Sequence, residues 1–134
     1  MSLHRLEIST QQRMELVDLT AKLKGLVRQS GVREGICVVA VMHTTAGITV
    51  NENTDPHVRD DILAALERAV PSSGHYTHAE GNAHAHVKSS LVGHSTALVV
   101  SDGKLQLGSW QAVYLCEFDG PRRREVQVKL QADK

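Results

Sequence analysis

The sequence of 134 residues has few cysteines, few aromatic residues and no excess of charge of either sign. Its two cysteines, Cys37 and Cys116, stand alone in apolar segments without Cys-x-x-Cys spacing. We therefore expect buried reduced thiols rather than a disulfide or a zinc ligand. Fifteen basic residues balance fifteen acidic ones, so no long-range field favours nucleic acid or an anionic membrane surface. Any charged partner has to be bound locally.

Long apolar runs are also missing from the chain. No stretch approaches the roughly 20 apolar residues needed to span a bilayer, and residues 1–10 lack the apolar core of a signal peptide. These absences predict a soluble cytoplasmic protein without a membrane or nucleic-acid partner. A chain of this length is expected to form a single domain over residues 1–134, because it can bury a hydrophobic core without disulfides.

Two longer segments and one short segment have helical patterns. Leucines that recur at three- and four-residue steps predict an amphipathic helix over residues 14–30. Asp55 and Pro56 are typical of the N-cap and first position of a second helix, which Pro71 ends. A short third helix is expected over residues 85–91.

Apolar and alternating runs between these helices predict strands. Asp102-Gly103 is typical of a hairpin turn, since both residues tolerate a positive φ. The strands are predicted over residues 3–8, 36–42, 48–52, 96–100, 105–107, 112–118 and 125–130. The order, roughly βαββαβββ with a short extra helix, predicts an α+β fold. It would contain a mostly antiparallel sheet or sandwich, two main helices and a short third helix.

Histidine is the residue type that gathers in one part of the chain. Five of the eight histidines lie between residues 75 and 94, and His43 follows a predicted buried strand. If the third helix begins near residue 85, His86 faces the site and His84 does not, because residues two apart diverge on a helix. Three neutral imidazoles and a water would suit zinc. The alternative is a solvated polar loop that binds nothing.

Several other residues are candidates for a site, each with a structural alternative. Asp55 is explained as a cap, whereas Glu52 can orient imidazoles, act as a general base or bind magnesium. Trp110 can stack on a ligand, although core packing is favoured. The arginines of segment 122–124 can bind phosphate or form an ordinary charged hairpin tip, and Lys88 can contact phosphate or solvent. No P-loop, dinucleotide fingerprint or Ser-His-Asp order is present.

Five segments, in the same order along nearly the whole chain, resemble the YjbQ family of small proteins regarded as secondary thiamine-phosphate synthases. They are His43-Thr44-Thr45-Ala46, Asn51-Glu52-Asn53 with Asp55-Pro56, His78-Ala79-Glu80-Gly81, Ala85-His86-Val87-Lys88 and Leu107-Gly108-Ser109-Trp110-Gln111. The resemblance implies an α+β fold, a homotrimer and a histidine-lined pocket for a metal or a small anionic or phosphorylated molecule.

The resemblance and the residue patterns together give a set of candidate site residues. The metal ligands are His43, His78 and His86, the catalytic carboxylates are Glu52, Asp55 and Glu80, and the substrate contacts are Thr44, Asn51, Lys88, Trp110 and Arg122. The implied reaction joins a hydroxymethylpyrimidine diphosphate to a thiazole phosphate and releases pyrophosphate, as a main or a side activity. A diphosphate substrate favours magnesium, whereas imidazoles favour a zinc-like ion. The alternatives are a metal-dependent hydrolase and a non-catalytic trimeric binding protein.

Overall fold

The computed structural model describes residues 2–134, which form an α+β fold as predicted. Its strands are β1 (Ser2–Ser9), β2 (Glu15–Asp18), β3 (Gly35–Val41), β4 (Ala46–Glu52), β5 (Ser95–Ser101), β6 (Lys104–Leu105), β7 (Gln111–Glu117) and β8 (Arg123–Ala132). Its helices are α1 (Thr20–Ser30), α2 (Pro56–Ala69) and α3 (Ala83–Val92). Among residues 2–134, none of the helices combines the length and the apolar composition that a bilayer-spanning segment requires.

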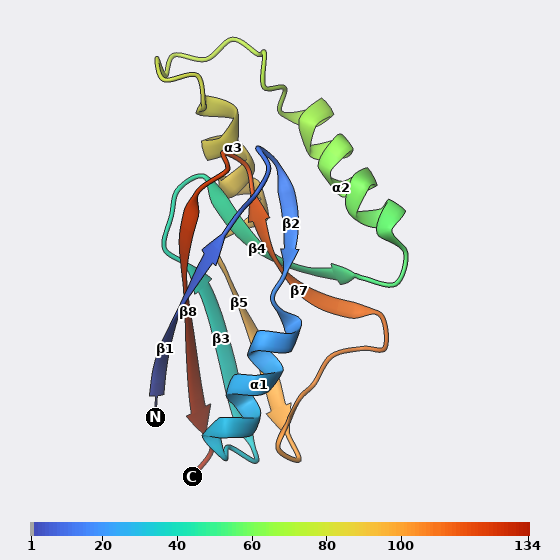
Figure 1. The fold of residues 1–134 in the computed structure, drawn as a ribbon, viewed down its shortest axis with the longest axis vertical. Coiled ribbons are helices and arrows are strands. Elements are labelled where there is room, and N and C mark those ends of the chain that lie inside the picture. The colour runs from blue at the N-terminus through green and yellow to red at the C-terminus, as the bar shows by residue number, and fades with distance from the viewer. Residues whose placement is uncertain (1) are drawn as a thin grey trace.

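The strands form two antiparallel sheets with a hydrophobic core between them. One sheet has the order β1-β8-β3-β5-β6 and the other has the order β2-β7-β4. On β8, Val126, Val128 and Leu130 are buried at alternate positions, as expected when one face of a sheet covers a core. Figure 1 shows α1 across the lower end of the molecule and α3 at the upper end, beside the loop that follows α2.

Both cysteines are buried free thiols, as the sequence predicted, with Cys37 in this core and Cys116 in a second apolar cluster around Tyr114. Burial raises the pKa of Cys37 to about 11 and that of Cys116 to about 12. The thiolate is the reactive form of cysteine, so these side chains remain protonated and unreactive at neutral pH.

The helix predicted over residues 14–30 is shorter, because its first part is a strand. Residues Glu15–Asp18 form β2 and pair with β7, and α1 begins only at Thr20. Asp18 Oδ1 accepts a hydrogen bond of 2.8 Å from the Thr20 amide, and Gly31 ends the helix with a φ of 74°. Leu16 fits the leucine spacing of the helix, but it is buried from a strand. The other predicted elements exist, with boundaries shifted by at most two residues.

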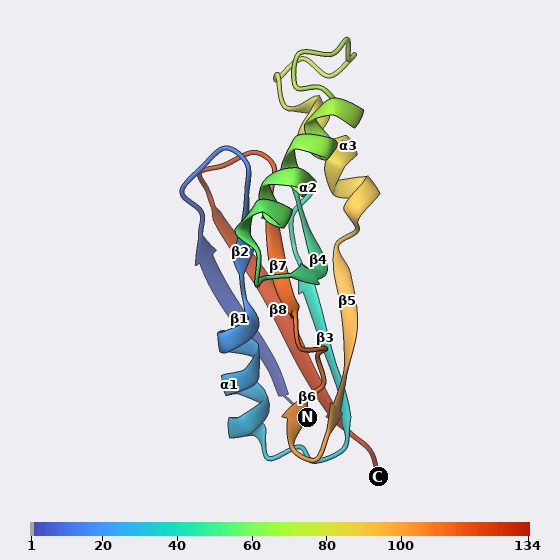
Figure 2. The ribbon, with the colours of Figure 1, turned by 90° about the vertical axis from the view of Figure 1, so that its right-hand side faces the viewer.

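Helix α2 begins as predicted, yet it lies at the margin of the molecule. The Asp55 side chain caps it by accepting a hydrogen bond of 2.9 Å from the His57 amide, and Pro56 occupies its first turn. None of its 14 residues is fully buried. Ile62, Leu63 and Leu66 are half-buried against a second core cluster around Tyr114. Figure 2 shows α2 on the outside of the β2-β7-β4 sheet.

Candidate functional site

An open cleft lies where three connections of the fold meet: the β3–β4 turn, the β7–β8 turn and the start of α3. We call it the His43 cleft, and its volume is about 610 Å³. It is lined by His43, Thr44, Thr45, Glu80, Asn82, His86, Asp119, Arg122, Arg123 and Arg124. The structure thus brings together two of the three predicted histidine ligands and the three consecutive arginines. Thr44 and Glu80, both predicted from the sequence, also belong to this lining.

A buried ion pair fixes the floor of the cleft. Arg124 and Glu117 are almost completely buried, with 2% and 0% of their side chains exposed, and they form two contacts, one of them 2.9 Å from Arg124 Nε to Glu117 Oε1. Arg124 Nη2 also donates to the Thr45 hydroxyl at 2.8 Å, and Glu117 accepts the Asp119 amide at 2.9 Å. The pair therefore holds both turns that carry the cleft. Arg124 is a structural residue here.

His43 is held in one orientation by the main chain. The Glu125 amide donates to His43 Nε2 at 2.8 Å, so the neutral ring carries its proton on Nδ1. Burial and the Arg124 guanidinium lower the pKa of His43, which favours this neutral form. His43 is therefore a neutral N–H donor at the side of the cleft.

The other two predicted metal ligands are adjacent to each other. The ring centroids of His78 and His86 lie 5.2 Å apart and the rings meet edge to face. His86 lines both the His43 cleft and a neighbouring groove, whereas His78 lines the groove, together with Tyr76 and Val87, and not the cleft. His78 Nε2 lies 3.8 Å from a Glu80 carboxylate oxygen. Helix α3 therefore brings the His86 imidazole to the cleft, and the loop after α2 places the His78 imidazole beside it.

The donor set does not fit a metal ion within one chain. A metal on Nε2 of His43 would displace the Glu125 amide, and a metal on Nδ1 would displace the ring proton. Among residues 2–134, no three histidine, cysteine or carboxylate side chains are placed to share an ion. The predicted ligands His43, His78 and His86 are thus not assembled as a metal centre by a single copy.

The arginines differ in how firmly each is already bound. Arg122 donates from Nε to the Asp119 carbonyl at 2.7 Å and from Nη2 to the Asp119 carboxylate at 2.9 Å. Arg123 has only an exposed contact of 3.6 Å with Glu7. Exposed ion pairs contribute about 0–1 kcal/mol, so an anion can replace Glu7 at little cost. Arg123 is consequently the most available cation of the cleft, although the sequence singled out Arg122.

Asn82 and Asp119 add polar groups to the cleft wall. Asn82 Nδ2 donates to the Asp119 carboxylate at 2.8 Å, while the buried Asn82 Oδ1 has no hydrogen-bond partner. Burial alone would raise the pKa of Asp119, but hydrogen bonds from Asn82 and Arg122 outweigh burial and hold the pKa below its ordinary value. The cleft therefore combines the carboxylate of Asp119, which stays ionised, with the amide oxygen of Asn82, which is free to accept a hydrogen bond.

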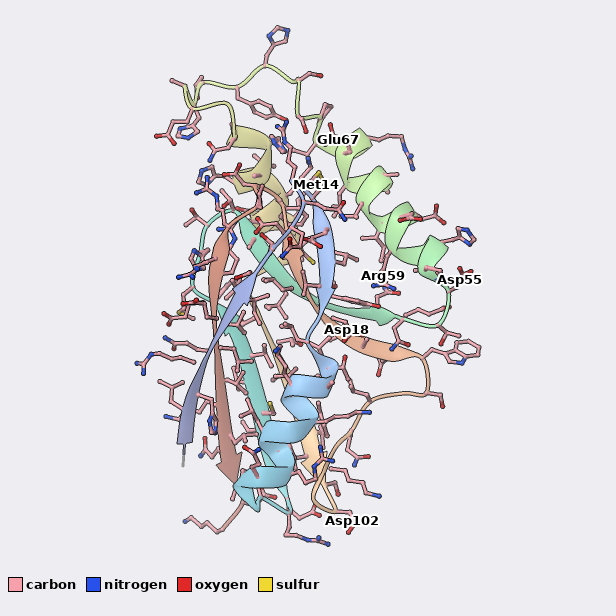
Figure 3. All side chains as sticks on the ribbon, in the orientation of Figure 1. Met14, Asp18, Asp55, Arg59, Glu67 and Asp102 are labelled. Carbon is pink, nitrogen blue, oxygen red and sulfur yellow. The ribbon has the colours of Figure 1, made fainter. Side chains whose placement is uncertain are left out.

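The segment around Glu52 lies away from the cleft. Figure 3 shows Asp55 and Arg59 at the margin opposite the β3–β4 turn of Figure 1. The Glu52 carbonyl accepts from the Tyr114 hydroxyl at 3.0 Å, and the Trp110 carbonyl accepts from the Asn53 amide at 3.0 Å. None of the predicted site residues Asn51, Glu52, Asp55 and Trp110 lines the His43 cleft. Trp110 is 65% exposed, so the prediction that it packs in the core is wrong.

Lys88 was predicted to contact substrate, but it is completely buried. Its ammonium group donates to Glu67 Oε1 at 2.7 Å and lies 2.7 Å from His84 Nδ1. His84 is also buried, and burial together with the charges of Lys88 and Arg13 lowers its pKa. The three side chains fasten α3 to α2, so Lys88 is not accessible to a substrate. The spacing of four residues between His84 and Lys88 was the available signal for this contact.

Comparison with known proteins gives matches over nearly the whole chain. A family model described as UPF0047 protein YjbQ-like matches residues 4–133. UPF0047 protein MJ1081 of Methanocaldococcus jannaschii is 50% identical over 132 residues, covering 98% of this chain and 96% of that protein. UPF0047 protein YugU of Bacillus subtilis is 43% identical over 129 residues, covering 96% of this chain and 98% of that protein.

Solved structures with the same fold are also found. A YjbQ/UPF0047-family protein of Clostridium acetobutylicum is 48% identical and has a TM-score of 0.94, with 96% of this chain and 99% of that chain covered. A YbjQ-like protein of unknown function from Sulfolobus solfataricus P2 is 34% identical and has a TM-score of 0.95, with 98% and 97% covered. The names of these relatives state no substrate and no reaction.

Proposed function

The chain belongs to the UPF0047, YjbQ-like family, and on this premise we propose that its His43 cleft binds a small phosphorylated molecule and transfers a group from it. The observation that carries the proposal is the convergence of two imidazoles and available guanidinium donors on one open cleft. Guanidinium groups match the geometry of phosphate oxygens. Imidazole is the usual general acid or base in proteins.

In such a reaction, the arginines of the cleft would bind the phosphate and the histidines would donate protons. Arg123 gives up its weak contact with Glu7 and binds the phosphate instead. Arg122 donates to the phosphate from the N–H groups of its guanidinium that do not bind Asp119. His43 donates its Nδ1–H to a phosphate or leaving-group oxygen. His86, which is half-buried and lines the same cleft, acts as the general acid that gives a proton to the departing phosphate oxygen. No step is assigned to a metal ion, because the ligand set of one chain does not fit one.

A transferase of the thiamine-phosphate synthase type is the specific reaction that we propose. Both of its substrates are phosphorylated, and its second product, pyrophosphate, is an anion that two arginines can hold. A cleft of about 610 Å³ has the size of a small-molecule site.

Binding of pyrophosphate tests the first part of the proposal. We expect His86→Gln and Arg123→Gln each to weaken pyrophosphate binding about tenfold, the effect of losing one charge-assisted hydrogen bond. Isothermal titration calorimetry at fixed ionic strength measures it. His57→Gln is the matched control, since His57 is exposed on α2 outside the cleft, and its affinity should be unchanged. Equal affinity in all three variants would contradict the assignment of this cleft.

Turnover tests the second part with the same variants. The wild-type protein is supplied with hydroxymethylpyrimidine diphosphate and thiazole phosphate, with and without added magnesium or zinc, and pyrophosphate release is measured. Release that His86→Gln abolishes supports the transferase. Release that survives in His86→Gln argues against this cleft as the catalytic site. Tight pyrophosphate binding without turnover of either precursor identifies a binding protein instead.

We also propose that the protein forms a homotrimer through the outer face of the β1-β8-β3-β5-β6 sheet. Ile36 and Val99 are paired across β3 and β5 on that face, where they are 43% and 57% exposed. Adjacent exposed apolar side chains of this size are typical of a contact surface. In a trimer, Glu52 and Asp55 can serve the His43 cleft only from a neighbouring copy, because they lie outside the cleft of their own chain.

A charge placed on this face should dissociate the assembly. We expect Val99→Lys to shift the mass in solution from three copies to one, since a lysine buried in an apolar contact is strongly unfavourable. Light scattering coupled to size exclusion measures the mass. Gln29→Lys, at an exposed position of α1, is the control that adds the same charge. A trimer that persists in Val99→Lys would rule out this face.

A further inference from the structure

A second cavity lies at the end of the molecule opposite the His43 cleft. It has a volume of about 440 Å³ and lies between α1 and the β5–β6 hairpin. Figure 1 shows both elements at the lower end of the molecule, and Figure 3 labels Asp102 at the tip of the hairpin. The cavity is lined by Lys24, Arg28, Arg33, Asp102, Gly103, Lys104 and Leu105. We call it the α1 cavity. The proposed function does not use any of these residues.

The α1 cavity has more cations than carboxylates to balance them. Arg33 is paired with Asp102 at 2.7 Å. Lys24, Arg28 and Lys104 make no ion pair within the described part of the chain. The whole chain has equal numbers of acidic and basic residues, so three uncompensated positive charges around one cavity are a local excess. Positive charges that line the same cavity repel one another, and an anion bound between them would remove this repulsion.

Glu34, the carboxylate next to Arg33 in the sequence, is already bound to the hairpin. Glu34 accepts hydrogen bonds of 2.8 Å from both the Ser101 hydroxyl and the Asp102 amide. These hydrogen bonds lower the pKa of Glu34, so it remains ionised and bound to the hairpin backbone. It holds the cavity wall in place and does not line the cavity.

The backbone around the cavity is well fixed. Lys24 and Arg28 are four residues apart on α1 and therefore project from the same face of the helix. The Gly103 amide donates to the Arg33 carbonyl at 3.0 Å, which ties the hairpin to the segment after α1. Gly103 has a φ of 73°, and a Cβ there would lie 3.1 Å from Arg33 Nη1. Leu105 is buried and forms an apolar part of the wall.

We propose that the α1 cavity binds a small molecule that carries at least two phosphate charges, such as a nucleoside diphosphate. Three free cations can neutralise a diphosphate, and Leu105 and the methylene groups of Lys24 and Arg28 offer an apolar surface to the rest of the ligand. The positive charge is confined to one cavity of a neutral chain, which favours a compact ligand over a nucleic-acid strand. This is a second ligand site, separate from the His43 cleft.

The test compares ADP, pyrophosphate and a single-stranded RNA as probes of the full-length protein. Amide chemical shifts measured by NMR during each titration report which end of the molecule responds. We expect ADP to shift residues of the α1 cavity, and the double variant Lys24→Gln/Arg28→Gln to weaken ADP binding about tenfold or more. Lys22→Gln/Lys129→Gln is the control, because it removes two exposed charges outside the cavity.

Each outcome decides for or against the proposal. Equal ADP affinity in the two double variants, or no response at the α1 cavity, overturns it. Pyrophosphate that shifts the residues of the α1 cavity and binds there as tightly as ADP identifies the phosphates alone as the ligand group and supports the site. A response to RNA without a response to ADP contradicts the compact ligand. His86→Gln should leave the ADP response unchanged, so failure here is distinct from failure of the His43 cleft.

Discussion

Arg124→Met is expected to destabilise the protein by about 3–5 kcal/mol, the largest effect of any single substitution proposed here. The Arg124 guanidinium is the cation that neutralises Glu117, and both side chains are buried. Methionine would leave the Glu117 carboxylate buried without a counter-charge. Denaturant unfolding followed by circular dichroism measures the change. Typical domains have a stability of about 5–15 kcal/mol, so a loss of this size is a large share of the total free energy of unfolding.

The neighbouring arginine provides the control for this prediction. Arg123→Met removes a guanidinium at the next position, where the pair with Glu7 is exposed, and should change stability by no more than about 1 kcal/mol. Adding Glu117→Gln to Arg124→Met removes the stranded charge and should restore part of the loss. If Arg124→Met proved as stable as Arg123→Met, the buried pair would not be the anchor of the two turns.

The second large effect is expected at Glu67. Lys88 is fully buried, and Glu67 is its carboxylate partner at 2.7 Å. Glu67→Gln leaves the ammonium group without a counter-charge, and because Glu67 itself is 41% exposed we expect a loss of about 2 kcal/mol rather than the full cost of a buried pair. Asp61→Asn, an exposed carboxylate on the same helix, is the control and should be neutral. A neutral Glu67→Gln would contradict the role of this pair.

The same pair makes stability depend on pH in a defined window. The hydrogen bond from Lys88 lowers the pKa of Glu67 from 4.5 to about 2. A depressed carboxylate pKa stabilises the folded state above the unfolded value, and this contribution is lost as the pH falls from about 4.5 towards 2. The lowered pKa of His84 acts at a higher pH than Glu67 does: the folded state loses stability as the pH falls below about 6.5, because the unfolded state then binds a proton more readily. The free energy of unfolding of Glu67→Gln should therefore decline less steeply below about pH 4.5 than that of the wild-type protein.

The fold was largely predictable because its elements have strong local signals. The Asp55 cap and Pro56 marked the start of α2, and Gly31 marked the end of α1. The strand β2 was missed because Leu16 satisfies both helical spacing and the alternation of a strand. Pairing with β7, about 100 residues away, decides between them, and no local pattern contains that information.

The candidate site was predictable only in part. His43 and His86 were singled out by clustering and motif, and the structure places both in one cleft. Lys88 was misread because its partner Glu67 is 21 residues distant and belongs to another helix. Trp110 was misread because its burial depends on which strands cover the end of β7, not on its neighbours in sequence. Whether a polar side chain joins the buried contacts of Lys88 or the open His43 cleft depends on tertiary structure, which sequence periodicity does not encode.

Helix α2 has no fully buried residue, so its local stability is expected to be lower than that of the two sheets. The sandwich shares its apolar contacts among eight strands, whereas α2 contributes only half-buried side chains and the link from Glu67 to Lys88. Local opening is easiest where few apolar contacts must be broken. We infer that α2 detaches and returns many times for each global unfolding event, and that each departure exposes the Lys88 ammonium group to water.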